Sequence, residues 1–178
     1  MKLFLMTAII ATTLAIGGCA QKQESTVPES IMTNDGNVNI LWQTPNDYSD
    51  IEATIGLQST FEQYLFTQLT DELGKLANKH LANDQQLDLT VTNVDLAGDV
   101  QPTFGATTND IRVISDLYPP KISFDYALTQ NGKIIKSGSE KLNNMGFLFG
   151  IQPITNDAFP YERDLLLDWF KKTIMPVL

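Results

Sequence analysis

One stretch in the middle of the chain constrains the fold most. Residues 87–91 alternate apolar and polar side chains, as in a β-strand with one buried face. The next large apolar residues, Val94 and Leu96, have the opposite parity, so one extra residue must be accommodated near residues 92–93. A β-bulge there would keep both runs on the buried face. We therefore predict a long, bulged central strand that ends in a turn at residues 98–99.

The remaining strands are predicted from the same alternation. Residues 38–42 read as the first strand and residues 111–114 as a short one. Residues 122–129 alternate cleanly and lead into Asn131-Gly132, which is typical of a two-residue hairpin turn. The polar residues 133–142 then return as a strand at the edge of the sheet.

Two helices are predicted from apolar residues at helical spacing. The first runs from Phe61 to Leu81, after a capping box formed by Ser59 and Glu62, and Gly74 in its interior favours close approach to a strand. The second opens at Pro160. Its predicted core stripe is Tyr161, Leu165, Trp169 and Thr173, with Leu166, Phe170 and Ile174 beside it. The elements predict an α+β domain: a mostly antiparallel sheet of four to five strands with two helices packed on one face.

The N-terminus has the layout of a secretory signal, with Lys2, an apolar run and small residues before Cys19. The apolar run is shorter than the ~20 residues of a membrane-spanning helix. Residues 16–19, Ile-Gly-Gly-Cys, resemble the lipobox of bacterial lipoprotein precursors. The resemblance implies that residues 1–18 are removed as a signal peptide and that Cys19 is acylated, for example with palmitate. Ala20 implies the inner leaflet of the outer membrane, facing the periplasm; secretion into the periplasm is the alternative.

Residues 19–37 are rich in polar residues and are predicted to form the lipidated N-terminus and a flexible tether. Residues 38–178 are predicted to form a single domain. The pair Ile31-Met32 could dock on that domain, but the composition favours an unstructured tether.

The composition excludes several kinds of chemistry. With 12 Lys and Arg against 21 Asp and Glu, the net charge of −9 argues against a nucleic-acid partner. Cys19 and His80 are the sole cysteine and histidine, which excludes a disulfide within the chain and a zinc site built from several cysteines. No nucleophile motif or phosphate-binding loop is present. We expect no catalytic residue, no metal site and no cofactor, and His80 reads as a surface residue.

Charged residues gather where the central strand ends. We predict that Asp95 and Asp99 form a polar cluster there with Arg112 and Arg163. Turn capping or pairing with the arginines is the simplest role for the two carboxylates. A metal or ligand site and general acid–base work stay open as alternatives.

The connection from residue 143 to residue 160 carries more apolar side chains than a solvated loop needs. Phe147 and Phe149 are candidate contacts for a protein partner, because exposed apolar patches usually bind something. In the alternative, the loop tucks under the domain.

A set of motifs is spread along the predicted domain. It consists of Trp42, Pro45, Tyr48 and Asp50-Ile51, then Val94-Asp95-Leu96-Ala97-Gly98-Asp99, Arg112, Pro120-Lys121-Ile122 with Tyr126, and Tyr161-Glu162-Arg163 with Leu167 and Trp169-Phe170. Together these motifs resemble a family of proteobacterial secreted proteins that is catalogued only as a domain of unknown function. Lys121 stands where an arginine is usual in that family. The family brings no established activity, so no catalytic residue is carried over.

These observations predict a lipid-anchored periplasmic protein that is a non-enzymatic binding or accessory module of the cell envelope. Its expected partners are the membrane, through acylated Cys19, and an envelope protein. A small-ligand carrier is the alternative, and a carboxylate-based hydrolase is a further one. A cavity between sheet and helices would favour the carrier.

Overall fold

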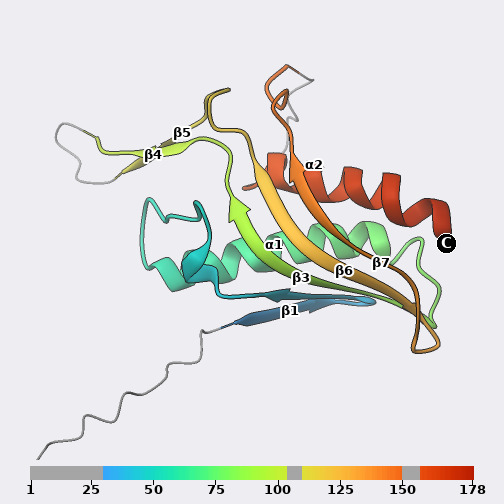
Figure 1. Ribbon diagram of the computed structural model, residues 1–178. Coiled ribbons are helices and arrows are strands. Elements are labelled where there is room, and N and C mark those ends of the chain that lie inside the picture. The colour runs from blue at the N-terminus through green and yellow to red at the C-terminus, as the bar shows by residue number, and fades with distance from the viewer. Residues whose placement is uncertain (1–29, 104–109, 150–156) are drawn as a thin grey trace, which may run out of the picture.

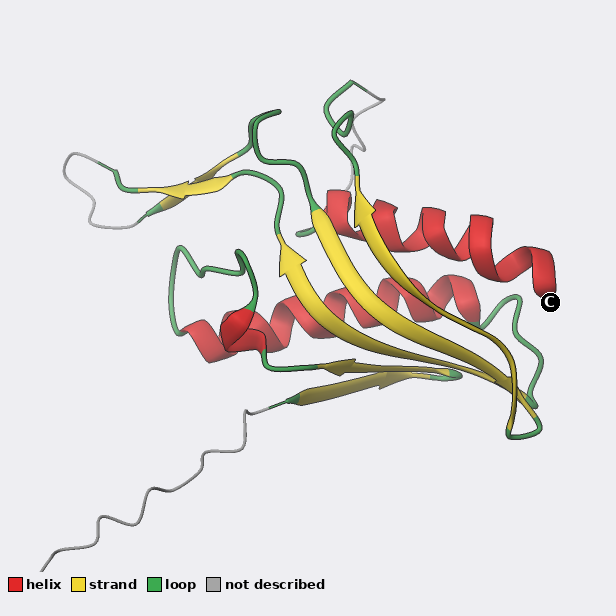
Figure 2. Cartoon of the chain, in the orientation of Figure 1, coloured by secondary structure: helices red, strands yellow, loops and turns green. Residues whose placement is uncertain are grey.

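The computed structural model describes residues 30–103, 110–149 and 157–178. Two helices, α1 and α2, lie on one face of a five-stranded sheet whose order is β1-β2-β3-β6-β7 (Figures 1 and 2). The short strands β4 and β5 form a separate two-stranded arm. This confirms the predicted α+β class. The bounds are β1 Ile31–Asp35, β2 Val38–Trp42, α1 Gln58–Ala77, β3 Gln85–Asp95, β4 Asp99–Gln101, β5 Ile111–Val113, β6 Lys121–Gln130, β7 Lys133–Asn143 and α2 Pro160–Trp169.

Strand β3 is the central strand, as the alternation predicted. It pairs in parallel with β2, through the α1 crossover, and antiparallel with β6. The register of β3 against β6 shifts between Val91 and Asn93, which confirms the predicted bulge. Val91 and Val94 are therefore both buried on the helix-facing side of the sheet. Strand β7 is at the sheet edge, and Asn131-Gly132 makes the turn before it.

The chain joins the sheet earlier than predicted. Residues 31–35, assigned from the sequence to a flexible tether, form β1 and pair antiparallel with β2. Thr33 explains this correction. Its hydroxyl oxygen accepts a hydrogen bond from Trp42 Nε1 at 2.8 Å and lies 2.6 Å from the hydroxyl of Thr70 on α1. Thr33 thus joins β1 to both β2 and α1. These contacts are made with distant residues, so the polar composition of the segment did not reveal that it is a strand.

Helix α1 starts without the predicted capping box. Leu57 is the N-cap and no side chain caps it, so Ser59 lies inside the first turn. Gln58 secures the helix start instead: its side chain accepts a hydrogen bond from Ala53 N at 2.9 Å and donates one to Ile51 O at 2.8 Å. The expected close approach at Gly74 is confirmed, because a Cβ there would lie 2.2 Å from Asp35 Oδ2 of β1.

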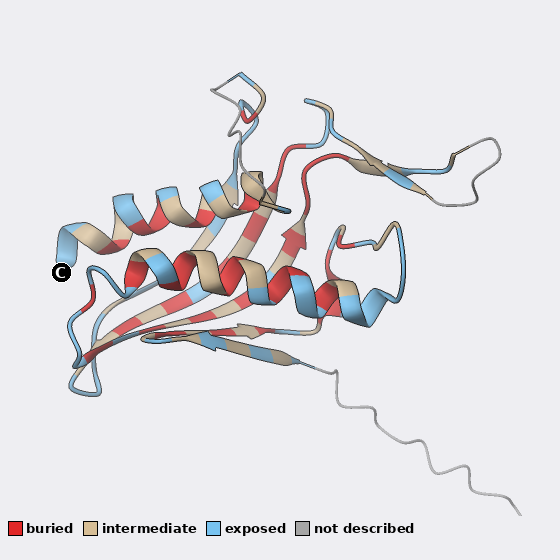
Figure 3. Cartoon of the chain, turned by 180° about the vertical axis from the view of Figure 1, so that it is seen from behind, coloured by how far each residue is buried: buried red, intermediate tan, exposed pale blue. Residues whose placement is uncertain are grey.

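The core lies between the helices and the sheet, as the buried inner faces in Figure 3 show. Trp42 and Phe66 stack at its centre with ring centroids 4.3 Å apart. Helix α2 is rotated relative to the predicted stripe, since Tyr161, Leu165 and Thr173 are only half-buried. A π-helical segment, Phe170–Ile174, and a 3-10 turn, Met175–Val177, follow α2. The residues buried along this whole stretch are Glu162, Leu166, Trp169, Phe170 and Ile174.

The two ends of the sheet differ. The register pairs Trp42 with Val91, Asp95 with Lys121, and Lys121 with Asn143, so the connections after β2, β3 and β7 and before β6 all lie at one end. We call this the loop end. The opposite end, called here the hairpin end, holds the turn at residues 36–37, the α1–β3 connection at residues 78–84 and the turn at residues 131–132. No helix in the described part of the chain is long and apolar enough to cross a membrane.

Candidate functional site

The loop end is organised by the segment that follows β2. A 3-10 turn, Pro45–Asp47, reverses the chain, and the Tyr48 hydroxyl then donates a hydrogen bond to Val91 O at 2.9 Å. Asp50 pairs with Asp95 as an isolated parallel bridge, in which Asp50 N donates to Val94 O at 3.2 Å and Leu96 N donates to Asp50 O at 3.0 Å. The backbone of this segment is thereby held against the end of β3.

Asp50 forms the central ion pair of the loop end. Arg112 Nη1 donates to Asp50 Oδ2 at 2.7 Å and Nη2 donates to Oδ1 at 2.8 Å, in a bidentate arrangement. The two side chains are 17% and 20% exposed. Burial raises the pKa of Asp50, but the hydrogen bonds from Arg112 and Glu52 N outweigh it, so this pKa lies below its ordinary value. Asp50 is therefore ionised at neutral pH, and the pair joins the β2–α1 loop to β5.

The structure divides the predicted polar cluster. Asp95 pairs with Lys121 Nζ at 2.6 Å and not with an arginine. Arg112 pairs with Asp50. Burial lowers the pKa of Arg112, but the hydrogen bond and charge of Asp50 outweigh it, with smaller contributions from the charges of Glu162 and Asp99, so this pKa lies above its ordinary value. Arg163 is separate: it pairs with Asp157 and Asp164 beside α1. Grouping Arg163 with Asp95 was wrong, because the carboxylates that pair with Arg163 are its neighbours along the chain, whereas Asp95 pairs with Lys121.

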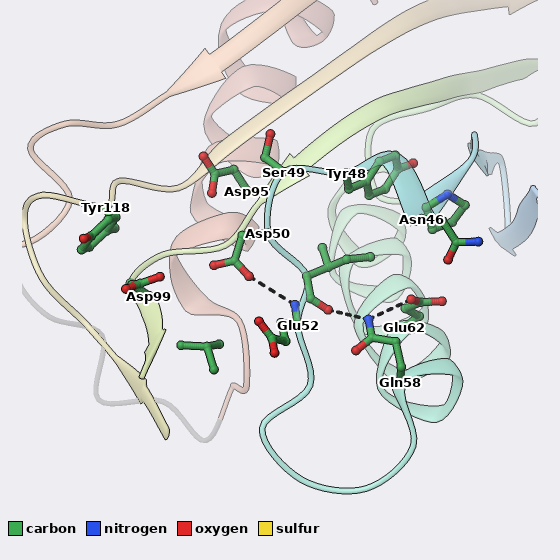
Figure 4. A pocket seen from close by; sticks show the side chains of 14 residues that line it. Asn46, Tyr48, Ser49, Asp50, Glu52, Gln58, Glu62, Asp95, Asp99 and Tyr118 are labelled. Carbon is green, nitrogen blue, oxygen red and sulfur yellow. Dashed lines mark hydrogen bonds between the residues drawn. The ribbon is translucent and has the colours of Figure 1, made fainter. Parts of the chain in front are cut away.

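An acidic cleft of about 600 Å³ opens over this segment. Figure 4 shows Asp50, Asp95 and Asp99 near the strand ends and Glu52 beside Asp50, with Gln58 and Glu62 on α1 farther along the cleft. Gln58 Nε2 donates a hydrogen bond to Glu62 Oε1 at 2.8 Å. The aromatic rings of Tyr48 and Tyr118 also line the cleft. Tyr48 is buried, and this burial raises the pKa of its hydroxyl far above the ordinary value.

A second, more apolar pocket of about 470 Å³ adjoins this region. It lies between the first turns of α1 and α2 and the chain leaving β3. Arg112 lines it, although Arg112 also forms the ion pair with Asp50 of the acidic cleft. Phe159 makes edge contact with Phe61 at 5.8 Å between centroids and a tilted contact with Tyr64 at the same distance. The main apolar and aromatic residues of this aromatic pocket are Phe61, Tyr64, Leu96, Ile114, Phe159 and Tyr161.

Glu162 lies at the edge of the aromatic pocket, and the sequence did not lead us to predict that it is buried. It is 2% exposed, and its Oε1 accepts a hydrogen bond from Ala97 N at 2.7 Å. Burial raises the pKa of Glu162, and the hydrogen bond from Ala97 N opposes that shift in part. Helical spacing could have found it, since Glu162 precedes the buried Leu166 and Phe170 at intervals of four.

The two candidate contact residues have different environments. Phe147 is 7% exposed and packs edge-on against Tyr161, with ring centroids 4.8 Å apart. It is therefore not available to a partner in this conformation, which corrects the expectation for that residue. Phe149 is 84% exposed, as a contact residue should be. Cys19 lies outside the described residues.

The described residues offer little conventional catalytic chemistry. Within ranges 30–103, 110–149 and 157–178, no three His, Cys, Asp or Glu side chains are grouped to hold a metal ion. Asp50 and Asp95 are each neutralised by a cation. His80 is exposed at the far end of α1. The arrangement is better suited to binding, since it offers an acidic cleft, an aromatic pocket and an ion pair that contributes to both.

Comparison with known proteins identifies the family but no function. No curated protein and no solved structure matches the chain significantly. Residues 36–172 match the family described as "Protein of unknown function (DUF3016)". This match spans the sheet from the β1–β2 turn to the π-helical segment after α2, including both pockets. The chain therefore belongs to the DUF3016 family of proteins of unknown function.

Proposed function

We propose that this chain is a lipid-anchored protein of the bacterial cell envelope that binds another envelope component through its loop end. One observation carries the proposal: exposed apolar side chains are concentrated there. Of the fourteen large hydrophobic residues that are exposed in the described part of the chain, eight lie in loop-end connections or the β4–β5 arm. These are Ile55, Leu57, Ile111, Ile114, Leu117, Tyr118, Met145 and Phe149.

The position of the N-terminus supports the same surface. Ile31 is paired with Trp42, so the chain enters β1 at the loop end. Residues 20–30 separate Cys19 from that point and span at most about 40 Å when fully extended. Acylation of Cys19 would thus keep the loop end close to the membrane surface. Two or more acyl chains are sufficient for stable anchoring.

The anchor is tested by replacing Cys19 with Ser and fractionating cells. The variant should leave the membrane fraction or accumulate as uncleaved precursor. Normal processing together with normal membrane association would show that the anchor is not at Cys19.

Binding is tested with a soluble form used as bait against envelope extract. The form should begin at Ser30, because a start at Asn37 would remove β1 and its contacts to Trp42 and α1. Leu57→Ser combined with Phe149→Ser should abolish capture of a partner while the fold is retained. Ile134→Ser with Ile135→Ser is the matched control, since both residues are exposed on β7 at the hairpin end. Equal loss of partner capture in the two double variants would contradict a binding site at the loop end.

A small-ligand carrier is the second candidate, and the aromatic pocket favours it. A pocket of about 470 Å³ lies within the range of small-molecule sites. Native mass spectrometry of protein purified from cells would detect a retained apolar ligand, and Leu96→Trp should displace that ligand by filling the pocket. Hydrolase activity is assayed in parallel with generic ester and glycoside substrates. Turnover abolished by Asp95→Asn or Asp99→Asn, without unfolding, would contradict the binding proposal.

A further inference from the structure

We infer that the partner segment recognised by the loop end is a polypeptide that combines basic side chains with apolar ones. The inference rests on the proposed use of the loop end as a binding surface and adds the chemistry of what binds there. It is carried by the coincidence, at one end of the molecule, of exposed apolar side chains and uncompensated negative charge.

The apolar component surrounds the two pockets. Leu57 and Leu117 are 72% and 77% exposed, far more than side chains that stabilise a core. Their loops border the pockets, because Glu52 and Thr54 precede Leu57 and line the aromatic pocket, whereas Tyr118 follows Leu117 and lines the acidic cleft. Residues of the β4–β5 arm and of its C-terminal extension add Ile111 and Ile114. Apolar side chains from several connections thus rim two concave sites.

The charge component is one-sided. Around the two pockets, Arg112, Lys121 and Arg163 are each engaged in an ion pair with a carboxylate, whereas the exposed Lys141 near the loop end of β7 has no ion pair among the described residues. Further carboxylates at this end and on its arm have no ion-pair partner among the described residues. They are Asp47, Glu52, Asp99, Asp110 and Asp116. Unpaired carboxylates therefore outnumber unpaired cations at this end, so an incoming cation gains net attraction.

The two pockets provide places for both kinds of side chain. A lysine or arginine can enter the acidic cleft, where the exposed ring of Tyr118 offers additional attraction to a cation. A neighbouring apolar side chain can enter the aromatic pocket beside Phe61 and Phe159. Asp50 lines the acidic cleft and Arg112 lines the aromatic pocket, so their ion pair marks where the two pockets meet. The basic and the apolar side chain that enter the pockets would therefore come from neighbouring positions of one partner segment.

The membrane surface itself is a poorer occupant. Anionic lipid headgroups attract basic segments and repel carboxylates within about a Debye length. The surplus of Asp and Glu at the loop end opposes such contact, although the exposed leucines alone would favour it. The charge therefore selects a basic polypeptide rather than an anionic bilayer.

The test uses the full chain, extracted in a nonionic detergent, and three labelled 12-residue peptides. One peptide alternates Lys and Leu, one alternates Lys and Ser, and one alternates Glu and Leu. Fluorescence anisotropy should show that the Lys-Leu peptide binds at least about tenfold more tightly than either other peptide, which is the effect of one good contact. Its affinity should fall as salt rises, because the charges are at the rim.

Variants locate the site. Leu57→Ser with Leu117→Ser should weaken Lys-Leu binding about tenfold at all salt concentrations. Glu52→Gln with Asp99→Asn should weaken it mainly at low salt and flatten the salt dependence. Ile134→Ser with Ile135→Ser at the hairpin end should leave the affinity unchanged. Circular dichroism confirms that each variant is folded.

Four results would overturn the inference: equal binding of the Lys-Ser peptide, equal binding of the Glu-Leu peptide, loss of binding in the Ile134 and Ile135 variant, or loop-end-dependent binding to phosphatidylglycerol vesicles. Failure of the proposed function is seen separately. A Cys19→Ser protein that stays in the membrane contradicts the anchor alone. Loop-end-dependent capture of an envelope protein without Lys-Leu binding contradicts only the partner chemistry.

Discussion

The hairpin end and the loop end of the same sheet are built in opposite ways. At the hairpin end, the connections are short, and polar side chains tie them to one another: Asn78 Oδ1 accepts a hydrogen bond from Asn37 N at 2.9 Å, and Asp84 Oδ2 accepts from Asn131 Nδ2 at 2.8 Å. At the loop end, long connections are held by contacts between distant segments, above all Asp50 with Arg112. It is the loop end that holds both pockets and most of the exposed apolar residues.

The difference separates stability from recognition. Short turns with satisfied backbone groups serve to close the sheet. Long connections on a rigid scaffold commonly carry binding residues. Substitutions at the two ends should therefore affect different measurements.

The largest effect is expected where β1 crosses α1 closely, towards the hairpin end. Gly74→Val should lower the free energy of unfolding by about 3 kcal/mol, because the new side chain meets Asp35 and forces β1 to move. Urea denaturation measures this loss. Gln63→Val on the exposed face of α1 is the control for the helix propensity of valine. An equal loss in both variants would show that the strand–helix contact is not responsible.

A smaller effect is expected from the ion pair of the loop end. Asp50→Asn should cost about 2 kcal/mol at neutral pH, since it leaves the half-buried Arg112 without its charge partner. The pKa of Asp50 is lowered in the folded state, so its contribution is complete above the unfolded pKa of about 3.9 and is lost as pH falls through the folded pKa. The two proteins should therefore converge in stability in acid.

Asp47→Asn is the control for that measurement, because Asp47 is exposed in the 3-10 turn and has no ion pair among the described residues. It should change the free energy of unfolding by less than about 0.5 kcal/mol. A stability difference between wild type and Asp50→Asn that persists unchanged at pH 2 would contradict the charge explanation.

Glu162→Gln should change the pH dependence of stability rather than its value in acid. The pKa of Glu162 is raised by burial, so the unfolded chain loses this proton first as pH rises. Wild-type stability then falls from the unfolded pKa of about 4.3 up to the folded pKa. The variant lacks this titration, so its free energy of unfolding should rise relative to that of the wild type over that pH range. Denaturation at several pH values tests the prediction, with the exposed Asp168→Asn as reference. Parallel profiles for wild type and Glu162→Gln would contradict it.

The smallest effect is expected for the apolar rim of the loop end. Leu117→Ser should change the free energy of unfolding by less than about 0.5 kcal/mol, because the side chain is 77% exposed. Thermal denaturation measures this change. Leu73→Ala in the core is the contrast, because removing that buried side chain should lower the free energy of unfolding by roughly 3 kcal/mol. If Leu117→Ser lowered the free energy of unfolding by more than about 1 kcal/mol, Leu117 would be a residue that stabilises the fold and not one that serves only to contact a partner.

Much of the hairpin end and of the sheet could be predicted because the signals are local. Alternation identified β6 and β3, the change of parity identified the bulge before Val94, and Asn131-Gly132 identified the turn. The helix α1 was found from its spacing, although its start was not, because Gln58 replaces the expected cap through contacts to another loop.

The candidate site was predicted only in part, because its contacts join distant residues. Asp95 ends β3 and Asp99 begins β4, and both line the acidic cleft. The partner of Arg112 is 62 positions away, and Glu162 is buried against Ala97, 65 positions away. No local pattern specifies such pairs.

The sequence by itself determined the α+β class, the central bulged strand, the edge hairpin and the family resemblance, since each depends on residue spacing or on short motifs. Only the tertiary structure decided that β1 joins the sheet, that Phe147 is buried while Phe149 is exposed, and that Asp50 is the partner of Arg112. The physical reason is that burial and pairing depend on which distant segments are brought together by packing, whereas periodicity depends on the geometry of one segment alone.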